Sequence, residues 1–208
     1  MRKAKYNIEE MVASITEENR HPAVDWGPDV GKGILPPELF YGTGDATLPI
    51  GNGRCIIAHL CNDIGAWGKG FVLPLAKRYP EAEAQYRTWS RRKTDPPFAL
   101  GQVQFVEVAA QVWVANMIGQ HGIYRRGATP PIRYEALREC LGRVRTFAHE
   151  RKADIQMPRI GCGLAGGDWK IVSKIVEEEL VLRGLSVFVL DLPAAHAVTV
   201  EQPRDDTK

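Results

Sequence analysis

The sequence has little cysteine and no paired cysteine motif. Four cysteines occur in 208 residues, and no two of them form a CxxC pair. Three of the four lie in apolar or glycine-rich surroundings, which is typical of reduced structural thiols. The cysteine content therefore favours a reducing cytoplasm.

An excess of charge of one sign and a long apolar run are also missing. The formal net charge is +2, from 27 basic and 25 acidic residues, so generic nucleic-acid binding through a basic face is not indicated. No apolar h-region follows the N-terminal stretch MRKAKYNIEEM, and no apolar run reaches membrane-spanning length. We therefore expect a soluble, cytoplasmic chain.

Composition divides the chain into three parts. Residues 1–38 end in DWGPDVGKGILPPE, where proline and glycine recur too often for a regular element. Residues 194–208 lack periodicity and are expected to fray. Between them, residues 39–193 alternate strand-like apolar runs, such as CIIAHL from Cys55, with helical patterns, such as the one that begins after Arg133. This alternation predicts an α/β domain.

Two glycine-rich segments each follow a strand-like run and precede a helix-like one. They are HLCNDIGAWGKGF (59–71) and IGCGLAGGDW (160–169). Glycine permits positive φ and close backbone approach, and helix starts attract anions. Either segment alone could be a simple turn. Because ligands of open α/β sheets bind at the carboxyl ends of strands, the two segments together predict a binding site for a diphosphate. Lys69 would add charge there or face solvent.

Three blocks of the sequence resemble the macrodomain family. They are GDAT (44–47), IIAHLCNDIGAWGKGFVLPLAKRYP (56–80) and MPRIGCGLAGGDW (157–169), in family order and at family-like spacing. The resemblance covers roughly residues 40–192 and points to the branch that contains ADP-ribose-1''-phosphate phosphatases and ADP-ribosyl-glutamate hydrolases. It implies a three-layer α/β/α fold with a mixed six-stranded sheet, and ADP-ribose in a cleft that needs no metal or cofactor.

The resemblance also implies ligand contacts. Asp45 falls where macrodomains contact the adenine amino group, although an aspartate is also common as a turn or cap residue. The first glycine-rich loop falls near the distal ribose and diphosphate, and the second wraps the diphosphate. The implied ligand-binding residues are Asp45, Ala46, Gly65, Ala66, Trp67, Gly68, Lys69, Gly70, Phe71, Gln120, Gly161, Cys162, Gly163, Leu164, Ala165 and Gly166.

The catalytic candidates are His59, Asn62 and Asp63. An imidazole near its ordinary pKa of about 6.5 can transfer protons at neutral pH, and phosphatases of this branch are thought to use a histidine at the place that matches His59. Asn62 could hold a ribose hydroxyl or a water, and Asp63 could polarise that water. Alternatively, His59 is a packed strand-end residue, and the other two form a turn. Cys162 could be a nucleophile, but a packing role is favoured because no cysteine-hydrolase signature surrounds it.

One departure from the family pattern bears on mechanism. The glutamate-linked hydrolases have an aspartate after GCGL and a lysine at the end of the fourth strand. This sequence has Ala165 and the lysine-free run NMIGQHG (116–122). A lysine–aspartate mechanism is therefore not expected, and water activation would fall to the three candidates above or to Gln120 and His121.

The N-terminal part resembles the toxin-binding tail of MazE-type antitoxins over residues 7–33. Between Asn7 and Gly31 there are six acidic residues and one basic residue, Arg20. An acidic segment anchored by Trp26 could occupy the RNA groove of a MazF-type ribonuclease. The alternative is a solvated linker.

Three functions follow from these patterns. The first is an ADP-ribose-binding hydrolase that removes ADP-ribose from modified macromolecules or the phosphate from ADP-ribose-1''-phosphate. The second is an ADP-ribose reader without turnover, and the third is an antitoxin-like binding protein.

Overall fold

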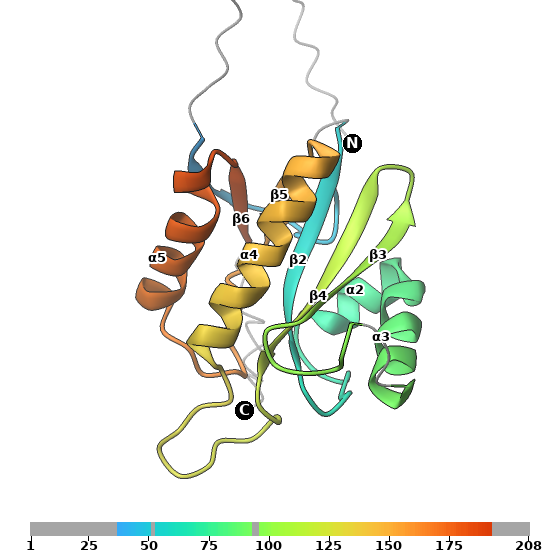
Figure 1. Cartoon of the computed structure of the whole chain (residues 1–208), viewed down its shortest axis with the longest axis vertical. Helices are drawn as coiled ribbons and strands as arrows, with labels where there is room; N and C mark the ends of the chain where they lie inside the picture. Colours follow the sequence, from blue (N-terminus) through green and yellow to red (C-terminus); the bar gives the residue numbers. More distant parts are fainter. Residues whose placement is uncertain (1–36, 51–52, 93–95, 193–208) are drawn as a thin grey trace, which may run out of the picture. The chain divides into compact units, whose positions relative to one another are not determined.

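The computed structural model describes residues 37–50, 53–92 and 96–192. Six strands form one sheet in the order β1-β6-β5-β2-β4-β3. All neighbouring strands are parallel except β3 and β4, which form an antiparallel pair at one edge (Figure 1). The strands are β1 (Leu39–Thr43), β2 (Cys55–Asn62), β3 (Val103–Ala109), β4 (Val112–Gln120), β5 (Asp154–Met157) and β6 (Val187–Asp191). The predicted α/β class and mixed six-stranded sheet are confirmed.

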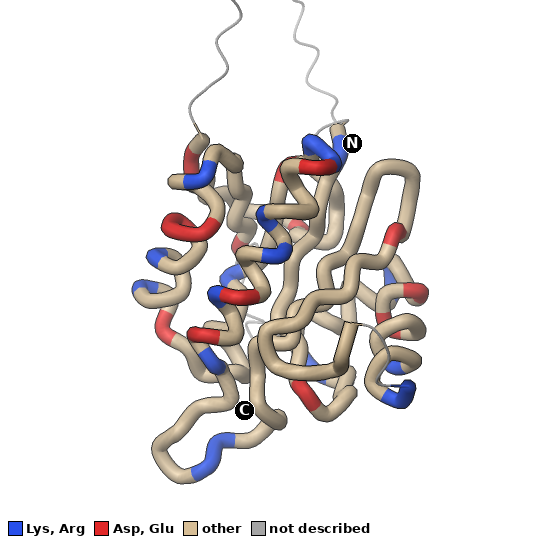
Figure 2. Tube along the Cα trace, viewed as in Figure 1, with Lys and Arg blue, Asp and Glu red and all other residues tan. Residues whose placement is uncertain are grey.

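The central strands are mostly apolar on both faces. β2 and β4 carry no Lys, Arg, Asp or Glu, and the positions coloured for these residues in Figure 2 lie on the helices, the loops and the strands β3, β5 and β6. Because side chains of a strand alternate between faces, β2 sends Ile56 and Ala58 into one core cluster and Ile57 and Cys61 into another. Near-continuous burial is expected of parallel strands that are covered on both sides.

Helices cover both faces of the sheet. The helices are α2 (Val72–Arg78), α3 (Pro80–Arg92), α4 (Tyr134–Arg151) and α5 (Trp169–Glu179), and the short 3-10 helix η1 spans Val181–Arg183. α4 and α5 contribute to the first core cluster, and α2 and α3 contribute to the second. On α4, Leu137, Leu141 and Val144 are fully buried, as the three- and four-residue spacing predicts.

The N-terminal and C-terminal segments fall outside this description. The segment similar to MazE-type tails, residues 7–33, and the C-terminal residues 194–208 lie outside the described residues. Within the ranges that the structure does describe, no helix is both long and apolar enough to span a bilayer.

Candidate functional site

Three loops leave the same edge of the sheet. β2, β4 and β5 are parallel and adjacent, so their carboxyl ends lie at one edge, where ligands of open α/β sheets settle. The segments that follow are the β2 loop (63–71), the β4 loop (121–133) and the β5 loop (158–168). Residues of all three loops line a cavity of about 650 Å³, a volume typical of small-molecule sites.

Most of the predicted site residues line this cavity. They are His59, Asn62, Ala66, Trp67, Gly68, Lys69, Gly70, Phe71, Gln120, Gly161, Gly163, Leu164 and Ala165. The predicted residues that do not line it are Asp45, Ala46, Asp63, Gly65, Cys162 and Gly166. The structure thus brings the two glycine-rich segments together around one space.

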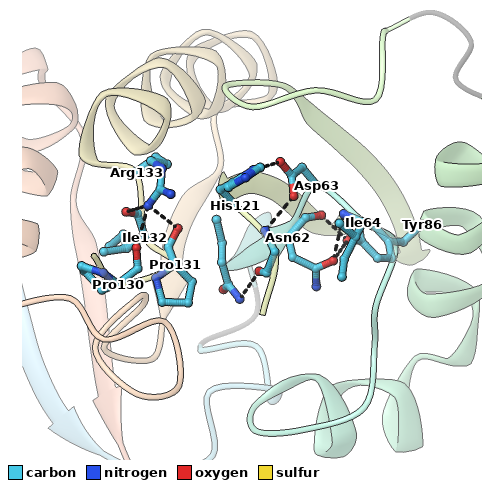
Figure 3. Close-up of polar contacts among 11 residues, drawn as sticks. Asn62, Asp63, Ile64, Tyr86, His121, Pro130, Pro131, Ile132 and Arg133 are labelled. Carbon is cyan, nitrogen blue, oxygen red and sulfur yellow. Dashed lines mark hydrogen bonds and ion pairs between the residues drawn. The ribbon is translucent and has the colours of Figure 1, made fainter. Parts of the chain in front are cut away.

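Side chains fix the shape of the β2 loop. Asn62 Oδ1 accepts a hydrogen bond from the Ile64 N–H at 3.2 Å (Figure 3). It also accepts from the Ala66 N–H at 2.9 Å, and Asn62 Nδ2 donates to the Ala66 carbonyl at 2.6 Å. The hydroxyl of Tyr86 donates to the Asn62 carbonyl from α3. The indole of Trp67 is 6% exposed and donates from Nε1 to the Val72 carbonyl at 3.1 Å. Asn62 is therefore a loop-forming residue as well as a cavity residue.

Glycines and backbone hydrogen bonds fix the shape of the β5 loop. Gly161 and Gly166 have φ of 73° and 69°, which residues with a Cβ rarely adopt. The Gly167 N–H donates to the Gly161 carbonyl at 2.8 Å, and a Cβ on Gly167 would stand 2.8 Å from that oxygen. The loop ends at Asp168, whose carboxylate caps α5 by accepting from the Lys170 N–H at 2.9 Å. This loop therefore presents backbone to the cavity.

The loops also meet one another. A Cβ on Gly70 of the β2 loop would lie 3.7 Å from Cδ1 of Leu164, a side chain of the β5 loop that is 65% exposed. The Ile132 N–H of the β4 loop donates to the Ala165 carbonyl at 3.1 Å. In the β4 loop, Arg133 Nη1 donates to the carbonyls of residues 130–132 (Figure 3). These contacts fix the positions of the three loops relative to one another.

His59 lies in the cavity wall but is 2% exposed. Its Nε2 is 2.6 Å from Asn116 Oδ1, and the rings of Trp67 and Phe71 pack against it. Burial lowers the pKa of His59 to about 4, although the hydrogen bond with Asn116 opposes that shift. The expectation of an imidazole near its ordinary pKa is wrong, because a fully enclosed ring cannot stabilise the charged form by hydration.

Asp63 and His121 form a pair at the ends of β2 and β4. Asp63 Oδ2 is 2.6 Å from His121 Nδ1, and Asp63 Oδ1 accepts from the Gly122 N–H at 2.8 Å (Figure 3). Neither Asp63 nor His121 is among the residues that line the cavity. The pair therefore ties the β2 loop to the β4 loop, and Gln120 is the member of the predicted rim that borders the cavity.

Asp45 is a turn residue in this structure. Its Oδ1 accepts from the backbone N–H of Thr47 at 2.9 Å and from the Thr47 hydroxyl at 2.7 Å, and Arg78 pairs with its Oδ2 at 3.2 Å. The neighbouring Ala46 is buried, and its carbonyl accepts from Gln156 Nε2 at 2.7 Å. Both of these residues thus shape the chain between β1 and β2, which matches the turn alternative for Asp45.

Cys162 has the environment of a packing residue. Its thiol donates to the Ile160 carbonyl at 3.3 Å, and the side chain packs against the first core cluster. Burial raises the pKa of this thiol to about 11, so it stays protonated at neutral pH, whereas a nucleophilic cysteine requires the thiolate.

Several cavity residues were missed by reasoning from the sequence. Ile123 and Tyr124 of the β4 loop line the cavity, and Tyr124 is 79% exposed. Arg159 also lines it, and its guanidinium makes a bidentate pair with Asp191, donating from Nε to Oδ1 at 2.8 Å and from Nη2 to Oδ2 at 2.7 Å. The guanidinium of Arg159 also lies over the rings of Tyr41 and Trp169, at 5.5 and 5.2 Å from their centroids. The run RIG before the glycines was the available signal for Arg159; no periodic pattern marks the β4 loop.

Acidic and metal-ligating side chains do not gather in this part of the fold. Across residues 37–50, 53–92 and 96–192, no group of three or more His, Cys, Asp or Glu side chains is placed to hold a metal ion. The residues that line the cavity with polar side chains include Asn62, Gln120, His59, Tyr124 and the cationic Lys69 and Arg159.

Comparison with known proteins places this architecture among solved structures. A protein of unknown function from Bacteroides thetaiotaomicron is 52% identical, with a TM-score of 0.73 over 75% of this chain and 99% of that one. A macrodomain protein from Streptomyces coelicolor is 50% identical, with a TM-score of 0.66 over 74% of this chain and 99% of that one. Thermosipho africanus DarTG in complex with ADP-ribose shares the fold at 15% identity, with a TM-score of 0.54 over 68% of this chain and 38% of that one.

Curated relatives are more distant, and no protein-family model matches the chain. Mouse chromodomain-helicase-DNA-binding protein 1-like is 26% identical over 168 residues, which are 76% of this chain but 18% of that protein. The chain thus spans under a fifth of this larger relative. An ADP-ribose 1''-phosphate phosphatase from Lodderomyces elongisporus is 21% identical over 65% of this chain and 87% of that enzyme. The chain is 50% identical to the macrodomain protein from Streptomyces coelicolor and covers 99% of it. The chain therefore belongs to the macrodomain family.

Proposed function

We propose that the cavity between the β2 and β5 loops binds ADP-ribose. The observation that carries this proposal is the pair of glycine-rich loops on adjacent parallel strands, β2 and β5, which both line one cavity of about 650 Å³. Backbone N–H groups and cationic side chains are the donors that a diphosphate needs. The fold shared with DarTG, whose solved complex contains ADP-ribose, supports the same ligand.

The binding test uses the wild-type protein and two substitutions at Gly163. No atom lies within 4 Å of the place that a Cβ on Gly163 would take, and this residue lines the cavity. Gly163→Ala should therefore fold like the wild type and lower the affinity much less than Gly163→Glu, which brings bulk and a charge of the same sign as the diphosphate. Calorimetry should give one-to-one binding, weakened about tenfold or more by the glutamate. If the wild-type protein shows no binding at millimolar ADP-ribose, the proposal is refuted.

We propose further that the bound ligand is hydrolysed, either at the bond to a modified macromolecule or at the phosphate of ADP-ribose-1''-phosphate. The distant relatives named as ADP-ribose 1''-phosphate phosphatases support this class of reaction. Uncharged groups, namely Asn62, Gln120 and neutral His59, would orient the water, because Asp63 is engaged by His121 and Gly122. Within this proposal a slow reaction is expected, since general-base catalysis typically contributes about 10²–10⁴-fold.

An ADP-ribose reader is the second candidate, and the environment of the predicted catalytic groups favours it. His59 is buried and neutral, and the side-chain amide of Asn62 makes its hydrogen bonds within the β2 loop. Separate incubations with ADP-ribosylated protein, ADP-ribosylated DNA and ADP-ribose-1''-phosphate distinguish the two functions. Release of ADP-ribose or phosphate in any tube supports the hydrolase, and tight binding with no release in all three supports the reader.

Binding of a MazF-type toxin by residues 7–33 stays a prediction from the sequence alone. Its support is the acidic, tryptophan-bearing segment that resembles MazE-type tails. An RNA-cleavage assay with such a toxin, comparing the intact chain with one that starts at Leu39, tests it. Inhibition by the intact chain only would support the interaction, and equal behaviour of the two chains would refute it.

A further inference from the structure

Three polar side chains stand side by side on β2, β4 and β3, in a part of the sheet that is mostly apolar. Asn116, in the middle of β4, is fully buried. Its register partner on β2 is His59, and its register partner on β3 is Gln104. Because paired residues in neighbouring strands send their side chains to the same face, the three can form a hydrogen-bonded row. The row runs from the cavity wall to the edge strand.

The acceptors around Asn116 fix the orientation of its amide. Asn116 Nδ2 donates to the Ala82 carbonyl of α3 at 3.2 Å and to Gln104 Oε1 at 3.1 Å. Gln104 in turn donates from Nε2 to the Gln85 carbonyl at 3.2 Å. A backbone carbonyl can only accept, so a flipped Asn116 would set its oxygen against the oxygen of Ala82. The Asn116 oxygen therefore faces His59.

This orientation determines which nitrogen of His59 carries the proton. Asn116 Oδ1 lies 2.6 Å from His59 Nε2, and two oxygen or nitrogen lone pairs do not approach so closely without a hydrogen between them. Nε2 is therefore the protonated nitrogen, and in the neutral ring Nδ1 keeps a free lone pair. The thiol of Cys61, a weak donor, lies 3.7 Å from Nδ1 and 3.8 Å from Nε2, a long contact to either nitrogen. His59 and Cys61 both line the cavity.

We propose that Asn116 is a positioning residue that holds His59 as the Nε2–H tautomer, so that His59 Nδ1 accepts a hydrogen bond from a hydroxyl of the bound ligand. The part that concerns the ligand rests on the proposed binding of ADP-ribose. Burial, which lowers the pKa of His59 to about 4, keeps Nδ1 available as an acceptor at neutral pH. His59 then serves the cleft as an oriented acceptor.

The first experiment needs no ligand, and its one variant serves only to assign the signals. The protein is labelled with ¹⁵N histidine, and the signals of His59 are assigned by their loss in His59→Gln. At pH 7 we expect a pyrrole-type resonance for Nε2 and a pyridine-type resonance for Nδ1. A protonated Nδ1, or an averaged pair of signals, would overturn the proposal whatever the protein binds.

The second experiment asks whether Asn116 sets the tautomer. Asn116→Leu removes the acceptor but keeps the branching at Cγ, so the His59 signals should move toward a tautomer mixture. Met117→Leu is the matched control, since Met117 is the next residue of β4, is also fully buried and packs in the opposite core cluster. Its His59 signals should stay as in the wild type. An unchanged tautomer in folded Asn116→Leu would refute the positioning role.

The third measurement links the tautomer to the ligand. Asn116→Leu should bind ADP-ribose more weakly than Met117→Leu, because only the fraction of His59 in the Nε2–H tautomer then offers Nδ1 as an acceptor; for equal populations of the two tautomers the loss is about twofold. Equal affinity of the two variants would refute the contact between Nδ1 and the ligand. Failure of the wild type to bind ADP-ribose would refute the proposed function and leave the tautomer assignment to be decided by the NMR signals.

Discussion

The β2 loop and the β5 loop border the same cavity, but they are built in opposite ways. The β2 loop is held by side chains, with the amide of Asn62 inside it and the buried indole of Trp67 packed on Tyr86. The β5 loop is held by the lack of side chains, because Gly161 and Gly167 leave room for its backbone to fold on itself. A loop at a ligand cavity can thus be shaped by the contacts of its side chains or by glycines that lack them. Truncation of a side chain should destabilise the first kind of loop, and addition of a methyl group should destabilise the second.

The largest expected effect comes from removing the main apolar side chain of the β2 loop. Trp67→Ala empties a buried site next to His59 and Tyr86, and it also removes the donor to the Val72 carbonyl. We expect the free energy of unfolding to fall by about 3–5 kcal/mol in urea denaturation. Leu164→Ala is the matched change in the β5 loop, where the side chain is 65% exposed, and it should cost less than about 1 kcal/mol. Equal losses would remove the distinction between the loops.

Acid should destabilise the protein through His59, which packs against the β2 loop. The pKa of His59 is lowered from an ordinary value of 6.5 to about 4, so the unfolded chain binds more protons than the folded one between these values. The contribution of neutral His59 to the free energy of unfolding is fully present above about pH 6.5 and is lost as the pH falls toward 4. This loss amounts to about 3 kcal/mol in total and about 2 kcal/mol at pH 5.

A substitution isolates this contribution from those of other groups. His59→Gln keeps a donor for Asn116 but cannot titrate. Urea denaturation at pH 7 and pH 5 should therefore show a drop in the wild type that exceeds the drop in His59→Gln by about 2 kcal/mol. Parallel pH profiles of the two proteins would show that His59 is not the group responsible.

The β5 loop should be sensitive to an added methyl group only at particular glycines. A Cβ on Gly167 would lie 2.8 Å from the Gly161 oxygen and 2.8 Å from Cδ1 of Ile132, so the backbone must shift. Gly167→Ala should lower the free energy of unfolding by about 1–3 kcal/mol. Gly163→Ala, four residues earlier, meets no atom within 4 Å and should change it by less than about 0.5 kcal/mol. Comparable losses at both positions would mean that glycine content alone, rather than close approach, sets the sensitivity.

The same contrast explains what the sequence could and could not predict. Glycine runs after apolar strands are visible locally, so the β5 loop, the strands β2 and β5 and the meeting of two loops at one edge were predictable. The role of Asn62 in shaping the β2 loop was anticipated only as a turn alternative. The burial of His59 was anticipated only as the alternative of a packed strand-end residue, because it depends on Trp67, Phe71 and the register partner Asn116, which are distant in sequence or carry no local signal. Gln120 and His121 were named as a possible rim, but Ile123 and Tyr124 of the β4 loop were missed, because their place at the cavity follows from the strand order.

The smallest expected effect concerns the link between the β2 loop and the β4 loop. Asp63→Ala removes both the contact with His121 and the hydrogen bond to the Gly122 N–H, whereas His121→Gln removes only the former. His121 is 37% exposed in its side chain, so water can replace its contact, and we expect a loss below about 1 kcal/mol for His121→Gln and a larger one for Asp63→Ala.

A double-mutant cycle in urea separates the two contacts of Asp63. If the pair acts as a tie between loops, the double variant should lose no more than Asp63→Ala alone, since His121 has no partner left once the carboxylate is gone. Full additivity would mean that His121 stabilises the β4 loop independently of the β2 loop. In that case the side-chain contacts of the β2 loop would not stabilise the β4 loop. The β4 loop would be stabilised, like the β5 loop, by its own backbone, and also by the hydrogen bonds from Arg133 to the carbonyls of residues 130–132.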